Sequence, residues 1–386
     1  MTPELQLALL DRLLAHRAAG PADMAAAERI VPAHLYQSAD QFGREYQALF
    51  RSLPLVLAPS SELPRPGDYL TCDDYGTPLL ITRDADGAVH VFENRCRHRG
   101  ARLVSAGQGR DRHAFACPYH GWTYGNTGDL RHVTHGECFA DTDTATHGLV
   151  RLPAQERFGL IWAVLDPAGR IDVDAYLGAM APEIAELDLE RHVTLPPYER
   201  PFAGNWKLYT ENFLESYHVH HAHSALVTGV RDDGILVDQV GPHTRFIGPR
   251  HTIDQLPKVD RKRWRLRPCA YFTYFIFPNT QLSVDPDRLM WQRVYPGRVN
   301  ETRIVQTLLV PELAQGGQWP DIWALSRSRD VAALEEDMRI VDTITEGLET
   351  GLLPGFRFGL REPGIIAFHE TINRFLAAAA LAGGPP

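Results

Sequence analysis

Two short loops, each with one cysteine and one histidine, restrict the possible folds of this chain more than any other feature. The first reads CRHRG and contains Cys96 and His98, and the second reads CPYHGW and contains Cys117 and His120. Eighteen residues separate His98 from Cys117, and a glycine follows closely after each histidine. Four metal-binding side chains in two such tight loops fit poorly with four unrelated core residues. We therefore expect them to hold one metal centre.

Two kinds of metal centre use two thiolates and two imidazoles. Structural zinc sites of this composition usually pair their cysteines in a CxxC knuckle and their histidines on a helix, whereas here cysteine and histidine alternate. In a Rieske [2Fe-2S] cluster, two cysteines hold one iron and two histidines hold the other. Because each loop supplies one ligand of each type, the pattern favours the Rieske cluster.

The bulk composition restricts the partners of the chain. Of its 386 residues, 44% are hydrophobic and 23% are charged, as in ordinary globular proteins with two or three domains. The formal net charge of −9 argues against nucleic acid or an anionic membrane as a partner, because both attract basic proteins. No stretch approaches the roughly 20 apolar residues that span a bilayer.

Cysteine usage and the first residues predict a cytoplasmic protein. Five cysteines are too few, and odd in number, for a disulfide framework. Near the N-terminus, Glu4, Asp11 and Arg12 interrupt the apolar core that a secretory signal needs. We expect this stretch to form a short amphipathic helix instead.

The pattern of apolar residues predicts an α+β protein with three parts. Residues 1–44 are expected to be mostly helical, and residues 45–165 consist of short apolar runs between turns, which is typical of a compact β domain. Residues 166–386 contain alternating strands and turns over 270–310, followed by a long helix over 328–350 and a terminal helix. Antiparallel strands followed by helices are typical of α+β folds.

The two loops resemble a known signature. The stretches NRCRHRG and ACPYHGWTYGNTGDL resemble the Rieske motif of the Rieske non-haem iron oxygenases, the aromatic-ring-hydroxylating oxygenase alpha-subunit family. Respiratory Rieske proteins carry two further cysteines that form a disulfide, but Ala101 and Tyr119 stand at those positions here. The eighteen-residue spacer is slightly longer than is usual in the family. The resemblance implies a β-rich Rieske domain at 45–165 and a helix-grip-like catalytic domain at 166–386 with a mononuclear Fe(II).

A second group of candidate ligands lies in NWKLYTENFLESYHVHHAHSAL, residues 205–226. If 206–219 is one helix, Asn212, Glu215 and His218 share a face at spacings of three. A di-iron carboxylate site would need two Glu-x-x-His motifs, and only one is found. A His-x-Glu pair at 135–137 is another candidate for a triad. Spacing alone leaves four histidines open as ligands, namely His218, His220, His221 and His223.

The resemblance selects among these histidines. ENFLESYHVHHAH is similar to the family segment that binds the mononuclear iron, and this similarity implies His218 and His223 as ligands. A regular helix would place these two about 140° apart, so we expect the helix to end or kink between them. His220 and His221 are then expected to support the structure or the iron ligands.

The third iron ligand is expected in the helix over 328–350. Asp337 lies within an apolar stripe of that helix, where a carboxylate needs a partner such as a metal. EEDMRIVD also resembles the family segment that supplies the third ligand, again at Asp337. The alternative is that Asp337 caps a helix or pairs with an arginine. The apolar stripe consists of Leu334, Val341, Ile344 and Leu348.

The resemblance also implies a route for electrons. In this family electrons cross between subunits of a trimer through a carboxylate three residues before the first iron histidine. That position is Glu215, and its implied partner is His120 of the neighbouring chain; the alternative is that Glu215 only fixes the tautomer of His218. We take Glu215 and Asn212 as candidate catalytic residues. Glutamate at this position resembles enzymes that act on quaternary ammonium compounds such as carnitine.

These features together predict the terminal oxygenase of a multicomponent system. No nucleotide-binding glycine motif is present, so a separate NAD(P)H-dependent reductase of flavin or ferredoxin type must supply the electrons. The expected reaction is hydroxylation or oxidative demethylation of a small quaternary ammonium or N-methyl compound. The alternatives are hydroxylation or O-demethylation of an aromatic carboxylic acid, and a Rieske electron carrier without catalysis. YFTYFIF (271–277) and Trp291 are candidate pocket residues.

Overall fold

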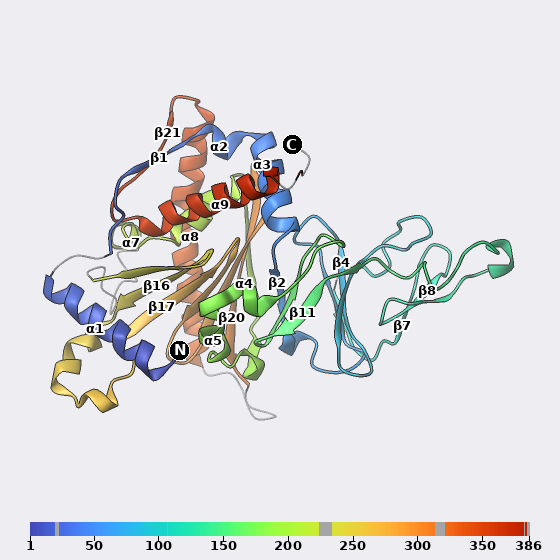
Figure 1. Ribbon diagram of the computed structural model, residues 1–386, viewed down its shortest axis with the longest axis horizontal. Coiled ribbons are helices and arrows are strands. Elements are labelled where there is room, and N and C mark those ends of the chain that lie inside the picture. Colours follow the sequence, from blue (N-terminus) through green and yellow to red (C-terminus); the bar gives the residue numbers. More distant parts are fainter. Residues whose placement is uncertain (20–22, 106, 224–233, 313–320, 382, 384–386) are drawn as a thin grey trace. The chain divides into compact units, whose positions relative to one another are not determined.

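The structure, a computed structural model (Figure 1), describes residues 1–19, 23–105, 107–223, 234–312, 321–381 and 383. The chain divides into two compact units. The smaller unit comprises residues 49–176 and 188–193, and the larger unit comprises 1–48, 177–187 and 194–386. The N-terminal residues, expected as a separate segment, are thus part of the larger unit. The domain limits at 44 and 165 stay a prediction.

The smaller unit is built from antiparallel β-sheets, as the sequence predicts. Five strands pair in the order β10-β5-β4-β3-β6, and two three-stranded sheets have the orders β11-β12-β2 and β7-β8-β9. The strands are β2 (Leu55–Pro59), β3 (Tyr69–Cys72), β4 (Leu79–Arg83), β5 (Val89–Glu93), β6 (Gln108–Gly109), β7 (Ala114–Ala116), β8 (Thr123–Gly125), β9 (Leu130–His132), β10 (Arg151–Leu152), β11 (Ala154–Arg157) and β12 (Leu160–Ala163). The 3₁₀ turns are η2 (Ser60–Glu62), η3 (Gly136–Cys138) and η5 (Leu189–Arg191).

The core of the smaller unit fixes the two metal-binding loops. Cys96 and Cys117 are buried in one apolar cluster with Phe92, Phe115 and Tyr124. Because these aromatic side chains come from β5, β7 and β8, the sheets and the loops share a single core. The chain leaves this unit at α4 (Val173–Leu177) and enters it again at residue 188. It leaves for the second time within β13 (His192–Thr194).

The larger unit contains an antiparallel sheet in the order β20-β19-β18-β17-β16-β15, and β14 also pairs with β20. The predicted strand-and-turn region at 270–310 forms β17 to β20, and consecutive strands pair through short connections. Each strand is amphipathic or fully buried, as antiparallel strands commonly are. The strands are β14 (Tyr198–Phe202), β15 (Leu236–Val240), β16 (His243–Pro249), β17 (Ala270–Ile276), β18 (Thr280–Val284), β19 (Leu289–Arg298) and β20 (Glu301–Pro311).

Helix α6 packs against α8 and α9 in this unit and also against β19, and α9 packs against β15. Among the described residues, every helix is too short or too polar to traverse a lipid bilayer. The helices are α1 (Pro3–Ala19), α2 (His34–Gln37), α3 (Ala39–Glu45), α5 (Ala181–Ala185), α6 (Trp206–Asn212), α7 (Val219–Ala222), α8 (Asp321–Glu349) and α9 (Pro363–Leu381). The 3₁₀ segments are η4 (Gly178–Met180), η6 (His251–Lys258) and η7 (Arg261–Arg263), and a π-helix, η1 (Tyr46–Arg51), begins in this unit and ends in the smaller one.

A buried ion pair fixes α6 to the N-terminal segment. Lys207 Nζ lies 2.7 Å from Glu45 Oε2, and both side chains are only 1% exposed. Trp206 Nε1 donates to the same carboxylate at 3.0 Å. A buried charge pair holds its geometry strictly, because breaking it leaves an uncompensated charge. The pair therefore sets the position of the helix that leads into the histidine-rich segment.

Three local expectations were wrong. The helix considered over 206–219 ends at Asn212, where the last bonds tighten to Phe213 N→Thr210 O and Leu214 N→Glu211 O, and α7 begins only at Val219. Helix α8 begins at Asp321, before the predicted start. The loop expected after α8 contains β21 (Gly355–Phe358), which pairs with β1 (Arg29–Pro32), and such a distant pairing leaves no local periodicity in the sequence.

Candidate functional site

The two cysteine–histidine loops adopt the same local hydrogen-bond pattern. Cys96 N donates to Ala101 O at 2.8 Å, and Cys117 N donates to Trp122 O at 2.8 Å. The glycine after each histidine closes its loop on the cysteine carbonyl, at 2.9 Å in the first loop and 3.0 Å in the second. Both glycines have positive φ, +73° and +71°, which other residues adopt only with strain. The loops are therefore built alike around their cysteines.

The side chains of these loops suit a Rieske cluster. Cys96 and Cys117 are buried and form no disulfide. The rings of His98 and His120 lie 4.7 Å apart between centroids. The Nδ1 atom of His120 is buried without a hydrogen-bond partner, as expected for an atom that binds iron. The two thiols thus share one buried cluster, and the two imidazoles lie side by side.

Neighbouring groups tune the cluster site. The Tyr124 hydroxyl lies 3.3 Å from Cys96 Sγ and accepts a hydrogen bond from Arg97 N at 2.9 Å. Burial raises the pKa of the Cys96 thiol, and the adjacent Cys117 adds to the rise. Iron must therefore displace thiol protons when it binds. Trp122 stacks on the ring of His98 at 5.0 Å and fixes its plane.

His218, His223 and Asp337 meet in the larger unit. Their ligand atoms all lie within 4.8 Å of one another. Asp337 Oδ1 lies 2.9 Å from Nε2 of His223 and 3.6 Å from Nε2 of His218. The carboxylate is 3% exposed, and among the described residues it pairs with these two rings and with no arginine. Two imidazoles and one carboxylate are the donor set of non-haem Fe(II) sites.

Breaks in helical structure bring the two histidines together. His218 immediately precedes α7 and His223 follows it, so one short turn separates them. Helix α7 ends at Ala222, between the two ligands. Helix α6 already ends at Asn212, so the helical structure is also interrupted before His218. His221 is exposed, while the side chain of His220 lies outside the described part of the structure.

Carboxylates hold the outer nitrogens of both rings. Nδ1 of His218 contacts Glu215 Oε1, and Nδ1 of His223 lies 2.8 Å from Glu336 Oε2. A metal-binding histidine usually donates its second ring N–H to such a group, which fixes the tautomer with Nε2 free for the metal. The sequence interpretation missed Glu336. Two signals in the sequence could have indicated Glu336. It lies next to Asp337, and the second imidazole needs a hydrogen-bond acceptor.

A cavity of about 420 Å³ borders the triad. Its wall includes His218, His223 and Asp337 together with Asn212, whose Nδ2 is buried without a partner. Four aromatic side chains complete much of the apolar wall, namely Phe213, Phe246, Tyr271 and Phe272. A space of this size admits a small organic molecule next to the triad.

Some of the predicted pocket residues lie elsewhere. Trp291 is fully buried, with the Arg293 guanidinium 3.6 Å from its ring centroid, and it does not line this cavity. Tyr274, in the predicted aromatic run, donates to Glu183 at 2.9 Å in the core. Strand alternation explains the position of Trp291, because its neighbours on β19, Met290 and Gln292, line the cavity and point to the opposite face. The His135–Glu137 pair is exposed in both side chains and gathers no third ligand among the described residues.

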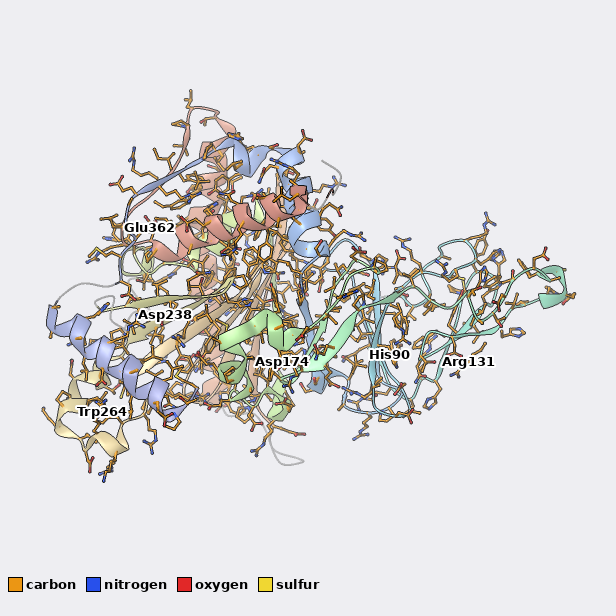
Figure 2. The ribbon with its side chains drawn as sticks, viewed as in Figure 1. His90, Arg131, Asp174, Asp238, Trp264 and Glu362 are labelled. Carbon is orange, nitrogen blue, oxygen red and sulfur yellow. The ribbon has the colours of Figure 1, made fainter. Side chains whose placement is uncertain are left out.

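A second cavity of about 220 Å³ shares Glu215 and Asn212 with the large cavity. Glu211 and Glu362 also line it, and Glu362 precedes α9 (Figure 2). Burial raises the pKa of Glu362, and the nearby charges of Glu215 and Glu211 add to the rise. Glu211 accepts a hydrogen bond from the Tyr36 hydroxyl at 2.7 Å. Glu215 therefore borders both the cavity next to the triad and an acidic cavity.

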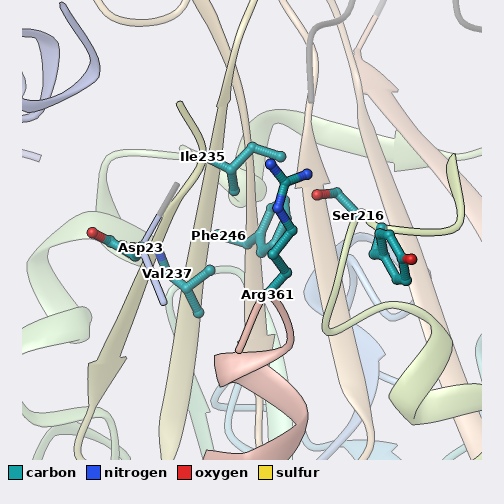
Figure 3. Close-up of a pocket in the computed structure, with 7 residues that line it drawn as sticks. Asp23, Ser216, Ile235, Val237, Phe246 and Arg361 are labelled. Atoms are coloured by element: carbon teal, nitrogen blue, oxygen red, sulfur yellow. Dashed lines mark hydrogen bonds between the residues drawn. The ribbon is translucent and has the colours of Figure 1, made fainter. Parts of the chain in front are cut away.

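A third pocket holds only about 20 Å³, enough for one water molecule. Arg361, Ser216, Ile235 and Phe246 converge on it (Figure 3). Phe246 and Ser216 also line the large cavity, so this small pocket adjoins it without offering room for a substrate.

Comparison with known proteins decides the family. Residues 54–149 match the Rieske [2Fe-2S] domain, and residues 185–378 match the ring hydroxylating alpha subunit (catalytic domain). The chain belongs to the ring-hydroxylating oxygenase alpha-subunit family. It is thus the terminal oxygenase of a Rieske system, with a [2Fe-2S] cluster and a mononuclear iron as cofactors and O₂ as co-substrate. Proteins of this family work with a separate reductase.

Relatives and solved structures agree with this assignment. The carnitine monooxygenase oxygenase subunit of Escherichia coli (strain K12) is 28% identical, covering 89% of this chain and 92% of its own length. Subunit alpha 2 of the terminal oxygenase component of terephthalate 1,2-dioxygenase from Comamonas sp. is 30% identical over 72% of this chain and 75% of its own. The quaternary ammonium Rieske monooxygenase CntA with L-carnitine shares the fold, with a TM-score of 0.77, 23% identity and coverage of 92% and 96%.

Proposed function

We propose that this oxygenase hydroxylates or oxidatively demethylates a small quaternary ammonium or N-methyl compound. The observation that carries the proposal is the aromatic wall of the cavity next to the triad, formed by Phe213, Phe246, Tyr271 and Phe272. Aromatic faces attract an alkylated ammonium through their negative quadrupole. The carnitine monooxygenase relatives, which span most of both chains, support the same substrate class.

In this proposal, His218, His223 and Asp337 hold the mononuclear iron through two Nε2 atoms and one carboxylate. When bound, the iron supplies the activation of dioxygen. Glu215 and Glu336 keep each Nδ1 occupied, so both rings present Nε2 in a fixed direction. The buried Nδ2 of Asn212 remains free to donate a hydrogen bond into the cavity. The aromatic wall excludes water and holds the substrate beside the triad.

The cluster ligands in this proposal are Cys96, His98, Cys117 and His120. Because Nδ1 of His120 is the buried ring nitrogen, it suits iron, and Nε2 is left to donate a hydrogen bond outward. Glu215 is a suitable acceptor, since its carboxylate lines the second cavity as well as the iron-ligand cavity. We infer a homotrimer in which Glu215 bridges His218 and His120 of a neighbouring subunit. CntA, whose fold this chain shares, has been described in terms of inter-subunit electron transfer.

The remaining partners follow from the same proposal. The electron donor is an NAD(P)H-dependent reductase of flavin or ferredoxin type, and the setting is the cytoplasm, in keeping with free cysteines in the described structure. Nucleic acid is not expected as a partner, given the net charge of −9.

The second candidate is an aromatic carboxylic acid as substrate. The terephthalate dioxygenase relative favours it, as do arginines 250, 288 and 329, which line the same cavity. A flat ring would also suit the aromatic wall.

Oxygen uptake by the iron-loaded enzyme with a surrogate reductase and NADH separates these candidates. Carnitine and γ-butyrobetaine are compared with aromatic carboxylates and methoxyarenes, and product masses are recorded. We expect a betaine to stimulate uptake and to yield trimethylamine or a demethylated product. Stimulation by an aromatic compound alone would refute the quaternary ammonium proposal.

A further inference from the structure

The large cavity has a charged end remote from the triad. Asp330 lies two turns before Asp337 on α8, about 10 Å along the helix axis at 1.5 Å per residue, and both carboxylates line the cavity. Arg250, Asp285 and Arg288 line the same space. We call Arg250, Asp285, Arg288 and Asp330 the charged subsite. A ligand that reaches from the triad to this subsite is the size of a small zwitterion or a monocyclic acid.

The subsite is built around one carboxylate between two arginines. Arg250 Nη2 lies 2.7 Å from Asp285 Oδ1, and Arg288 Nη2 lies 3.0 Å from Asp285 Oδ2. Arg288 also lies 3.7 Å from Asp330. Because Asp285 holds both guanidinium groups, their positions are fixed before any ligand arrives, which lowers the entropic cost of binding.

Three polar atoms of the subsite are buried without a hydrogen-bond partner. They are Nε of Arg250, Nε of Arg288 and Oδ2 of Asp330. Buried polar groups are normally paired, so these three atoms leave the subsite with unused hydrogen-bonding capacity. Two of the three are donors on cations, and the third becomes a donor when Asp330 is protonated.

The charges around Asp330 favour an anion. On its own helix Arg329 is exposed and lines the cavity. From the turn between β18 and β19, Arg288 and Asp285 act on it, and Arg250, just after β16, pairs with Asp285. Two further charges adjoin this group, namely Arg267 and Asp287, and Asp287 pairs with Arg288 at 3.2 Å. Arg267 Nε donates to the Asp285 carbonyl at 2.9 Å, and Asp287 accepts from Trp323 Nε1 at 3.1 Å.

The sum of these charges depends on one proton. Four arginines face three aspartates when Asp330 is ionised, and two when it is protonated. Together with its neighbours Arg267, Asp287 and Arg329, the subsite is therefore positive in both states, whereas its own four residues are neutral when Asp330 is ionised and positive when it is protonated. Burial raises the pKa of Asp330 to about 6, so its proton can be retained near neutral pH when a second carboxylate approaches.

We propose that the charged subsite binds the carboxylate of the substrate, with protonated Asp330 as one of its hydrogen-bond donors. This inference rests on the proposed function only in that the substrate occupies the large cavity, because a betaine and an aromatic acid would both use the subsite. The substrate then lies with its carboxylate on Arg250 and Arg288 and its oxidised carbon near the triad. Binding takes up a proton, so affinity falls as pH rises above about 6.

The test measures the dissociation constant of γ-butyrobetaine and of choline, which lacks the carboxylate, by calorimetry on the iron-loaded enzyme at pH 6 and pH 8. The variants are Asp330→Asn, which mimics the protonated acid, and Arg288→Met. Asp321→Asn, an exposed position on the same helix, is the matched control. We expect Asp330→Asn to tighten betaine binding about tenfold at pH 8 and to remove its pH dependence, with choline unaffected.

Arg288→Met is expected to weaken the betaine about 10- to 100-fold and to leave choline unchanged, since a charged hydrogen bond is lost. Equal effects on both ligands, or an unchanged pH dependence in Asp330→Asn, would overturn the inference. If Arg288→Met does not fold, Asp330→Asn decides alone. A third outcome separates the two proposals. If neither γ-butyrobetaine nor choline binds, but an aromatic carboxylate binds and responds to Asp330→Asn in the same way, the quaternary ammonium proposal is contradicted and the subsite is supported.

Discussion

Glu336 Oε2 lies 2.8 Å from Nδ1 of His223, whose Nε2 lies 2.9 Å from Asp337. Two consecutive residues of α8 thus contact the two nitrogens of one ring. A helix that supplies both the third ligand and the support of the second ligand couples the geometry of the triad to its own position.

Replacing Glu336 by Gln is expected to weaken iron binding about 10- to 100-fold, because the tautomer and basicity of His223 are no longer fixed. The measurement is iron content and affinity, with the visible spectrum of the cluster unchanged. Glu349→Gln, exposed on the same helix, should bind iron like the original protein. Equal affinity in the two variants would show that Glu336 does not support the ligand.

His218→Ala and Asp337→Ala are each expected to empty the mononuclear site and leave the cluster spectrum intact. Removing one of three ligands leaves too few donors to hold Fe(II). His221→Ala is the control, because His221 lies in the same segment but is exposed. Loss of both metal centres in one variant would contradict two independent sites.

Glu215→Gln is expected to keep both metal centres and to lower turnover by about 100-fold, since the carboxylate bridge loses its charge. A single-turnover experiment with a pre-reduced cluster measures the transfer step directly. Glu370→Gln is a control, as this residue is largely exposed and pairs with Arg29. Full activity in Glu215→Gln would refute the bridge. Weaker iron binding with normal electron transfer would show that Glu215 only supports His218.

Gly121→Ala is expected to lower the cluster content. An added Cβ would lie 2.7 Å from Thr134 Oγ1, at a φ of +71° that already disfavours alanine. Gly87→Ala is the matched control, because its φ is +85° but nothing lies within 4 Å of the added atom. Iron and sulfide analysis should show cluster loss in the first variant and retention in the second, and equal content would show that the close contact is harmless.

The free energy of unfolding should depend on pH through the titration of Asp330. Its pKa is raised from 3.8 to about 6 by burial, so its stabilising contribution is complete below pH 3.8 and is lost as pH rises through 6. The loss between pH 5 and pH 8 is about 1 kcal/mol. Urea unfolding measures this difference. From pH 5 to pH 8, the free energy of unfolding of Asp330→Asn should rise relative to that of the original protein, whereas that of Asp321→Asn should not. The same difference at both pH values would contradict this assignment.

The sequence alone was sufficient where chemistry is local. Cys96 and His98, or Cys117 and His120, lie in loops of a few residues, so their spacing already restricts the metal that they can bind. The hydrophobic stripe around Asp337 likewise placed a carboxylate on the inner face of a helix, because helical periodicity fixes which residues share a face. The strands over 270–310 were predictable for the same reason, since alternation is a property of neighbouring residues.

Only the tertiary structure decided what distant segments do together. The pairing of β1 with β21, the contact of Glu336 with His223 and the two cavities that share Glu215 join residues far apart in the chain. Trp291 illustrates the limit, because an aromatic residue on a strand looks the same in sequence whether it faces a cavity or the core. The sequence determined which donors the protein has, and the fold determined which of them meet, since burial and packing depend on contacts that no local pattern encodes.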